Sequence, residues 1–67
     1  MDANDFFAEI AKTMTDRDLI RAVGKISPTD REHKFKAGIY IRELSRRDIR
    51  TAMMLYEIWK EEGGGRA

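Results

Sequence analysis

The segment Thr15-Asp16-Arg17-Asp18 decides how this chain folds, because its hydroxyl and its last carboxylate lie three residues apart before an apolar stretch. Such a hydroxyl accepts a hydrogen bond from an orphan amide of the first helical turn, and the carboxylate can bond back to the capping residue. The anion also suits the positive end of the helix dipole. The same spacing recurs in Ser27-Pro28-Thr29-Asp30 and in Ser45-Arg46-Arg47-Asp48. These helix starts, with one more helix before them, predict an all-α fold of four short helices.

The size of the chain limits how stable it can be alone. A length of 67 residues allows one domain, and a domain of this size buries only about 60% of the surface that its unfolded chain exposes. Domains this small usually need a further stabilising element, such as a disulfide, a bound metal or self-association. The chain has no cysteine and one histidine, His33, so neither a disulfide nor a structural metal is expected, and no cofactor is expected. Self-association remains, and we expect a small bundle completed by homodimerisation.

The sequence carries no sign of a membrane protein. No apolar run approaches the ~18 residues of a membrane span, and residues 1–5 carry two acids and no base, unlike a signal peptide. We therefore expect a cytoplasmic protein that contacts no membrane and takes no small-molecule substrate. Its helical domain is expected over 1–62, followed by a flexible glycine-rich tail over 63–67.

The first two helices follow from apolar periodicity and from capping residues. One apolar stripe at helical spacing predicts a first helix from residue 2 or 4; it consists of Ala3, Phe6, Phe7, Ile10 and Met14. A second helix is expected over 16–23. Gly24 is the expected C-terminal cap, because glycine accepts the left-handed conformation that ends many helices.

The third helix is expected to start at Ser27, with Pro28 in the first helical position. Residues 35–41 also fit a strand, because their apolar and polar side chains alternate strictly. The helix is preferred, since a lone strand has no partner except a copy of itself. On a helical wheel, Phe35 and Ile39 share one face, and the opposite face is also apolar. A helix with two apolar sides is expected to lie at the centre of the bundle.

The last helix is expected from Ser45 or Arg46 to about residue 61. Its predicted core stripe consists of Ile49, Ala52, Met53, Tyr56 and Trp59. Leu55 and Ile58 widen this stripe to roughly 200°, whereas about 100° suffices for a helix on one core. We therefore expect a second copy or another protein to share this helix. The predicted dimer or partner surface consists of Phe6, Phe7, Met54, Leu55, Ile58 and Trp59.

Arginines form the clearest charge pattern. The formal net charge is only +1, but residues 17–50 carry ten bases and five acids. Cations near a helix start oppose the helix dipole, and like charges one turn apart repel, so stability alone does not favour this cluster. Guanidinium groups bind carboxylates and phosphates bidentately, which favours an acidic partner. The alternative is local neutralisation by Glu43, Asp48 and Glu57. The predicted partner-binding cations are Arg17, Arg21, Arg46, Arg47 and Arg50.

No catalytic residue is predicted, because a nucleophile needs a neighbouring base and that base needs an orienting group. Ser27 and Ser45 are explained as caps, and Asp30 with His33 as a surface contact. The favoured function is a small non-enzymatic protein-binding module, a regulator or inhibitor that docks through an apolar helix surface flanked by arginines. The first alternative is a helix-turn-helix-like transcriptional regulator that binds nucleic acid through the basic middle segment. The second is a structural subunit of a larger assembly, which predicts a poorly folded isolated chain.

Residues 15–20 and 43–49, Thr15-Asp16-Arg17-Asp18-Leu19-Ile20 and Glu43-Leu44-Ser45-Arg46-Arg47-Asp48-Ile49, carry a family resemblance. Together they resemble the antiparallel helical hairpin of the small sporulation-checkpoint inhibitors of histidine kinases. The resemblance covers about half of the chain. In that family the second hairpin helix is richer in bulky apolar residues than residues 37–41, and the last helix has no counterpart. The resemblance implies binding to the helices of another protein, and no site residue is carried over from it.

Overall fold

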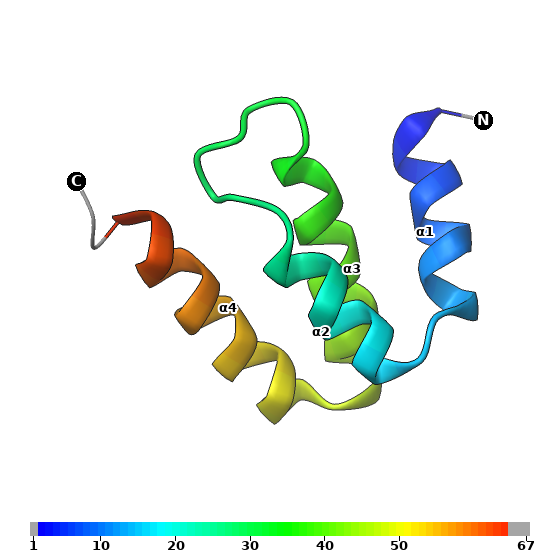
Figure 1. The fold of residues 1–67 in the computed structure, drawn as a ribbon. Helices are drawn as coiled ribbons and strands as arrows, with labels where there is room; N and C mark the ends of the chain where they lie inside the picture. The colour runs from blue at the N-terminus through cyan, green and yellow to red at the C-terminus, as the bar shows by residue number, and fades with distance from the viewer. Residues whose placement is uncertain (1, 65–67) are drawn as a thin grey trace.

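A computed structural model describes residues 2–64, which form four α-helices and no strand. In chain order these are α1 (Ala3–Thr13), α2 (Asp16–Gly24), α3 (Lys34–Arg47) and α4 (Ile49–Gly64). Figure 1 shows α1 and α4 on opposite sides of α3, with α2 lying across α3. The α1–α2 and α3–α4 turns lie at one end, and loop 25–33 lies at the other. The predicted all-α class with four helices is confirmed. None of the helices within residues 2–64 is both long enough and apolar enough to cross a bilayer.

The second helix begins after Thr15 as its capping box predicts, and the first begins at Ala3, between the two predicted starts. The Asp2 carboxylate accepts the Asp5 N–H at 2.9 Å. The Thr15 hydroxyl accepts the Asp18 N–H at 3.1 Å, and the Asp18 carboxylate accepts the Thr15 N–H at 3.3 Å, which completes the capping box. The predicted left-handed cap at Gly24 is wrong. Gly24 is the last helical residue without a positive φ, and the chain turns at Lys25, where φ is −86° and ψ is −9°.

The predicted start of the third helix at Ser27 is also wrong. The Ser27 hydroxyl accepts the Thr29 N–H, two residues on, at 3.2 Å, which stabilises a local turn rather than a helix. Asp30 instead orders the turn that leads into the helix. Its carboxylate accepts the N–H groups of Glu32 and His33 at 3.0 and 3.1 Å and contacts His33 Nδ1 at 2.9 Å. These bonds order a turn before α3 begins at Lys34.

The boundary between α3 and α4 lies three residues later than predicted. Helix α3 continues through Ser45 to Arg47, and Asp48 is the extended residue that breaks it, at φ −153° and ψ 90°. The Asp48 carboxylate accepts the Thr51 N–H at 3.2 Å and the Thr51 hydroxyl at 2.7 Å, so Asp48 caps α4. Helix α4 includes Gly63 and Gly64, where the flexible tail was predicted to start. The rest of that predicted tail, 65–67, lies outside the described residues.

Helix α3 is central, as predicted, because it packs against each of the other three helices. Residues 35–41 belong to it, so the strand alternative is wrong. Its buried face carries Ala37, Tyr40 and Leu44 at i, i+3 and i+7, and this face packs with Leu19 and Val23 of α2 in one cluster. The alternating pattern of 35–41 therefore reflects a helix with neighbours on both sides.

The core is small. Leu19, Val23 and Leu44 are the largest fully buried side chains. The other helices reach the core mainly through alanines, Ala11 of α1 and Ala52 of α4. Small side chains let helix backbones approach closely, but they remove little apolar surface from water. Packing alone therefore gives this fold a limited stability.

The stripe of α4 that meets the core is rotated from the predicted one, although Ala52 and Trp59 belong to both. Ala52 is buried, and Leu55 and Trp59 pack against the core. Ile49, Met53 and Tyr56, which were predicted to face the core, are exposed. The indole N–H of Trp59 explains this rotation, because it needs an acceptor when half-buried. It donates to the Ile26 carbonyl at 2.6 Å, which turns the other stripe outward.

The cap of α4 gives a pH-dependent test. Hydrogen bonds from Thr51, the hydroxyl first and then the backbone N–H, hold the pKa of Asp48 below its ordinary value of 3.8. A lowered folded-state pKa stabilises the fold above the unfolded pKa, and this contribution disappears as pH falls through the folded-state pKa. We expect Thr51→Val to raise the Asp48 pKa towards 3.8 and Thr51→Ser to leave it low, as measured by NMR titration. An unchanged pKa in Thr51→Val would contradict this cap.

Candidate functional site

The arginines that were predicted to bind a partner gather mostly at one end of the molecule. Helices α2 and α4 begin there and α3 ends there (Figure 1). Arg17 lies in the first turn of α2, Arg46 and Arg47 in the last turn of α3, and Arg50 in the first turn of α4. Arg21 follows one turn after Arg17. The chain topology therefore brings segments together that are more than thirty positions apart, as in the contacts of Arg47.

Arg47 uses its guanidinium inside the molecule. It donates to three backbone carbonyls at the end of α1 and to two carboxylates, at 2.7–3.3 Å; the acceptors are Ala11, Lys12, Met14, Asp16 and Glu43. The last carbonyls of a helix have no intrahelical donor. Arg47 therefore closes the end of α1 and ties it to α2 and α3.

The electrostatic environment matches this structural role. The hydrogen bond to Asp16 is the main cause that raises the pKa of Arg47 above its ordinary value, and Glu43 raises it further, against partial desolvation. The Arg47 side chain is only 27% exposed. Its contacts are those of a residue that holds the fold together, so a partner would compete with five existing acceptors.

The other four arginines are available at the surface. The Arg46 side chain is 66% exposed and pairs with Glu43 at 3.2 Å. Glu43 therefore accepts bonds from both Arg46 and Arg47, as the neutralisation alternative requires. Arg17, Arg21 and Arg50 are exposed and form no ion pair within residues 2–64.

The predicted apolar surface divides into buried and free parts. Leu55 and Trp59 are half-buried against the core, whereas Met54 and Ile58 are 66% and 55% exposed. Phe6 is exposed at 52%, and the half-buried Phe7 lies between it and Phe35, with ring centroids at 5.2 and 5.9 Å. The free apolar surface therefore lies on the outer side of α4 and at the start of α1.

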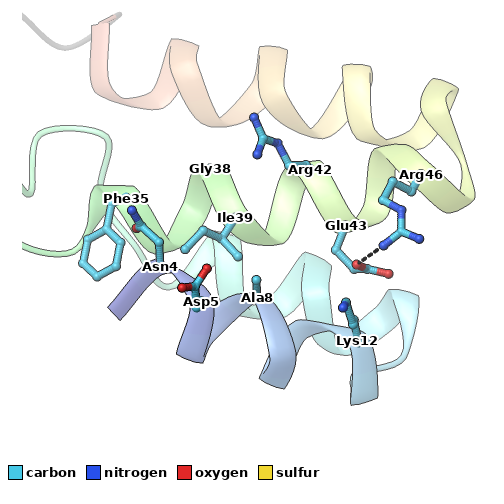
Figure 2. Close-up of a pocket in the computed structure, with 10 residues that line it drawn as sticks. All are labelled: Asn4, Asp5, Ala8, Lys12, Phe35, Gly38, Ile39, Arg42, Glu43 and Arg46. Atoms are coloured by element: carbon cyan, nitrogen blue, oxygen red, sulfur yellow. Dashed lines mark hydrogen bonds and ion pairs between the residues drawn. The ribbon is translucent and has the colours of Figure 1, made fainter. Parts of the chain in front are cut away.

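One groove runs between α1 and α3, with a volume of about 410 Å³. Figure 2 shows Ala8 of α1 beneath Gly38 and Ile39 of α3, with charged side chains along both rims. These charges have both signs, and Glu43 already pairs with Arg46 (dashed in Figure 2). The bases of this groove exceed its acids by only one, so its charge selects a ligand only weakly.

A second groove, which we call the α3–α4 groove, has a volume of about 580 Å³. Its cations are Arg31, Lys34 and Lys60, and its aromatic residues are Phe35, Tyr56 and Trp59. Pro28, Gly38 and Ile41 complete the lining, which contains no acidic residue. A smaller hollow of about 350 Å³ shares Ile41 and Tyr56 with it and continues along α4 towards Met53 and Ile49.

Gly38 lines both grooves and has no packing reason to be glycine. A Cβ built on it meets nothing within 4 Å, and its φ is not positive. Glycine within a helix costs stability because its backbone loses more freedom on folding. Gly38 thus leaves open space where the α1–α3 and α3–α4 grooves approach each other.

The polar residues singled out in the sequence around the start of α3 make local contacts with one another. Asp30 and His33 touch, as their spacing predicts, and the His33 hydrogen bond is the main cause that lowers the pKa of Asp30. This pair orders the turn before α3. In the described part of the chain, no three His, Cys, Asp or Glu side chains come together as possible metal ligands.

Comparison with known proteins does not place the chain in a family. No protein-family model matches it, and neither the curated proteins nor the solved structures searched contain a match. The resemblance to the histidine-kinase inhibitors therefore gains no support. The function has to be argued from the surfaces of the molecule itself.

Sequence reasoning missed the cations of the α3–α4 groove. Arg31 lies in the turn before α3, Lys34 is the first residue of α3, and Lys60 lies one turn after Tyr56. Their convergence depends on where α3 begins and on which side of α4 faces out. No local pattern signalled this convergence, and Lys34 even has an acid, Asp30, four residues before it.

The structural role of Arg47 can be tested directly. Lysine keeps the charge but has a single donor group, which cannot reach the carbonyls and carboxylates that the guanidinium fork joins. We expect Arg47→Lys to lower the urea midpoint of unfolding, followed by circular dichroism. Arg46→Lys is the matched control and should leave the midpoint unchanged, because that side chain makes one exposed contact. Equal urea midpoints for the two variants would mean that the internal contacts of Arg47 do not stabilise the fold.

Gly38 gives a prediction of opposite sign. Because the added methyl group meets open space, Gly38→Ala should stabilise the isolated chain by about 0.5–1 kcal/mol. Urea unfolding measures this difference. Destabilisation by Gly38→Ala would mean that the protein itself needs the space above Gly38, and the groove would then be closed in solution.

Proposed function

We propose that this chain is a non-enzymatic protein-binding module, a regulator or inhibitor that works as a homodimer joined through the outer face of α4. That face carries Met53, Met54 and Ile58, with Arg50 and Glu57 among them. The single observation behind the proposal is the exposure of this apolar helix surface in a chain with a very small core. A cytoplasmic location stays a prediction from the sequence.

The exposed apolar side chains of α4 are too many to be incidental. Ile49, Met53, Met54 and Ile58 are 55–66% exposed, although scattered single apolar residues on a surface need no explanation. Met53, Met54, Glu57 and Ile58 also line one shallow apolar hollow. Methionine is flexible and polarisable, which suits surfaces that accept a partner. These features support the proposal that a partner surface covers this face of α4 in the functional protein.

The pattern of charge on this face favours a second copy as the cover. Arg50 and Glu57 are seven residues apart, so they share one stripe of α4 but are separated by about 10 Å along the helix. They cannot pair within one chain. In an antiparallel pair of α4 helices with the two-fold axis between Met53 and Met54, each Arg50 stands opposite the Glu57 of the other copy. Such a self-complementary face is what an isologous dimer needs.

The remaining exposed arginines would then meet the target of the dimer. Arg17, Arg21 and Arg46 remain outside the Arg50–Glu57 stripe. Exposed guanidinium groups speed the encounter with an acidic surface and help to select it. Because Arg47 is held by five internal acceptors, the nucleic-acid alternative loses part of its basic cluster. Protein binding is therefore the function that we favour.

A charge exchange tests the dimer. We expect Arg50→Glu alone and Glu57→Arg alone to be monomeric in light scattering after size exclusion, because each places like charges opposite each other. The double variant Arg50→Glu/Glu57→Arg should again be dimeric. An equimolar mixture of the two single variants should form a heterodimer, since every pair is then of opposite sign.

The controls separate this arrangement from other dimers. Arg21→Glu, on α2, should leave the dimer intact, and each single variant should keep the helical content of the original chain. A monomeric original chain at high concentration would overturn the proposal. A dimer in every variant would overturn the proposed antiparallel register.

A further inference from the structure

We infer that the α3–α4 groove binds an acidic segment of a partner protein that carries aromatic or branched apolar side chains. This inference deepens the proposed function, because it names the site and the chemistry of the partner. It rests on three separate features of the groove: its charge, its apolar floor and the space above Gly38.

The charge of the groove is the first feature. Arg31, Lys34 and Lys60 line it, and no acidic residue does. The whole chain has 13 basic and 12 acidic residues, so a surface hollow with three cations and no acid departs from the average of the molecule. None of the three cations forms an ion pair within the described residues 2–64. An acidic ligand would supply the missing counter-charges.

The floor of the groove is the second feature. Ile41 and three aromatic side chains give an apolar surface, and a volume of about 580 Å³ lies in the range of ligand-binding clefts. A purely ionic partner would leave these side chains in water. Apolar anchors between the acids would cover them, as in the recognition of an amphipathic segment in a groove between helices.

Gly38 is the third feature. Glycine is the residue that allows another backbone to approach closely. Within this chain nothing comes near the position of a Gly38 side chain, so the free space serves no packing contact of the protein itself. A partner backbone that crosses α3 at Gly38 would use this space and would reach both Lys34 and Lys60.

The aromatic residues favour a peptide over a nucleic acid. Bases stack on free aromatic faces, but the aromatic groups here are partly engaged. Lys60 Nζ lies 5.5 Å from the centroid of the Tyr56 ring, and the Trp59 indole N–H is bound to Ile26. Phe35 packs edge-on with Phe7. These contacts leave apolar edges, which suit aliphatic and aromatic side chains of a peptide.

Two synthetic peptides and an oligonucleotide test the inference. In the first peptide glutamates alternate with phenylalanine and leucine, in the second lysines replace the glutamates, and the oligonucleotide is single-stranded. Trp59 is the only tryptophan, so its fluorescence and its indole NMR signal report on the groove. We expect saturable changes at Trp59 and Gly38 with the acidic peptide only. Changes with the oligonucleotide alone, with both peptides equally, or with no ligand would overturn the inference.

Charge reversal locates the binding site. Lys34→Glu and Lys60→Glu should each weaken binding of the acidic peptide several-fold, and the two together should abolish it. Lys12→Glu on α1 is the matched control, because Lys12 is exposed and does not line the α3–α4 groove, and it should bind as the original chain does. Gly38→Leu should weaken binding while Gly38→Ala keeps most of it. If Lys34→Glu and Lys60→Glu bind the acidic peptide as tightly as the original chain does, the peptide binds elsewhere.

The outcome is independent of the dimer. The monomeric variant Arg50→Glu should still bind the acidic peptide, because the Arg50 side chain does not line the groove. An original chain that binds the peptide but is itself monomeric would contradict the proposed homodimer alone. A dimer without binding would contradict the groove alone.

Discussion

The guanidinium of Arg47 is the contact on which the arrangement of the helices depends. It joins the last carbonyls of α1, the Asp16 carboxylate of α2 and Glu43 of α3. Among residues 2–62, the largest fully buried side chains are Leu19, Val23 and Leu44, and so small a core does not fix the positions of four helices by packing alone. A planar fork with several donors fixes direction as well as distance. The end of the molecule at which three helices meet is therefore held by one polar side chain.

A second polar contact holds the opposite end. The Trp59 indole donates to Ile26, so loop 25–33 is tied to α4. Between these two contacts α4 touches the core through Ala52 and Leu55. A helix anchored along so narrow a stripe leaves its other sides free. The exposed face of α4 and the α3–α4 groove thus follow from how α4 is attached, and they are available to partners for that reason.

The sequence predicts most helices and the central place of α3, because apolar periodicity and the Thr15 capping box are local properties. It fails where two local signals compete. Ser27 and Ser45 have the same spacing to aspartate as Thr15. At these two places, however, the carboxylates of Asp30 and Asp48 accept the hydrogen bonds of the next residues, because a carboxylate accepts several bonds at once. Arg47, Trp59 and the groove cations depend on contacts more than twenty residues away in sequence, which no local pattern encodes.

The two proposed surfaces are compatible in one assembly. Antiparallel pairing of α4 about a point between Met53 and Met54 places Lys60 about 10 Å from the two-fold axis along each helix, given a rise of 1.5 Å per residue. The two α3–α4 grooves then lie towards opposite ends of the paired helices, and neither needs the residues of the dimer stripe. A dimer of this kind holds two acidic segments at a fixed separation. Two weak grooves joined in this way would bind a bivalent target much more tightly than either would alone, so the proposed dimer would offset the small size of each binding surface.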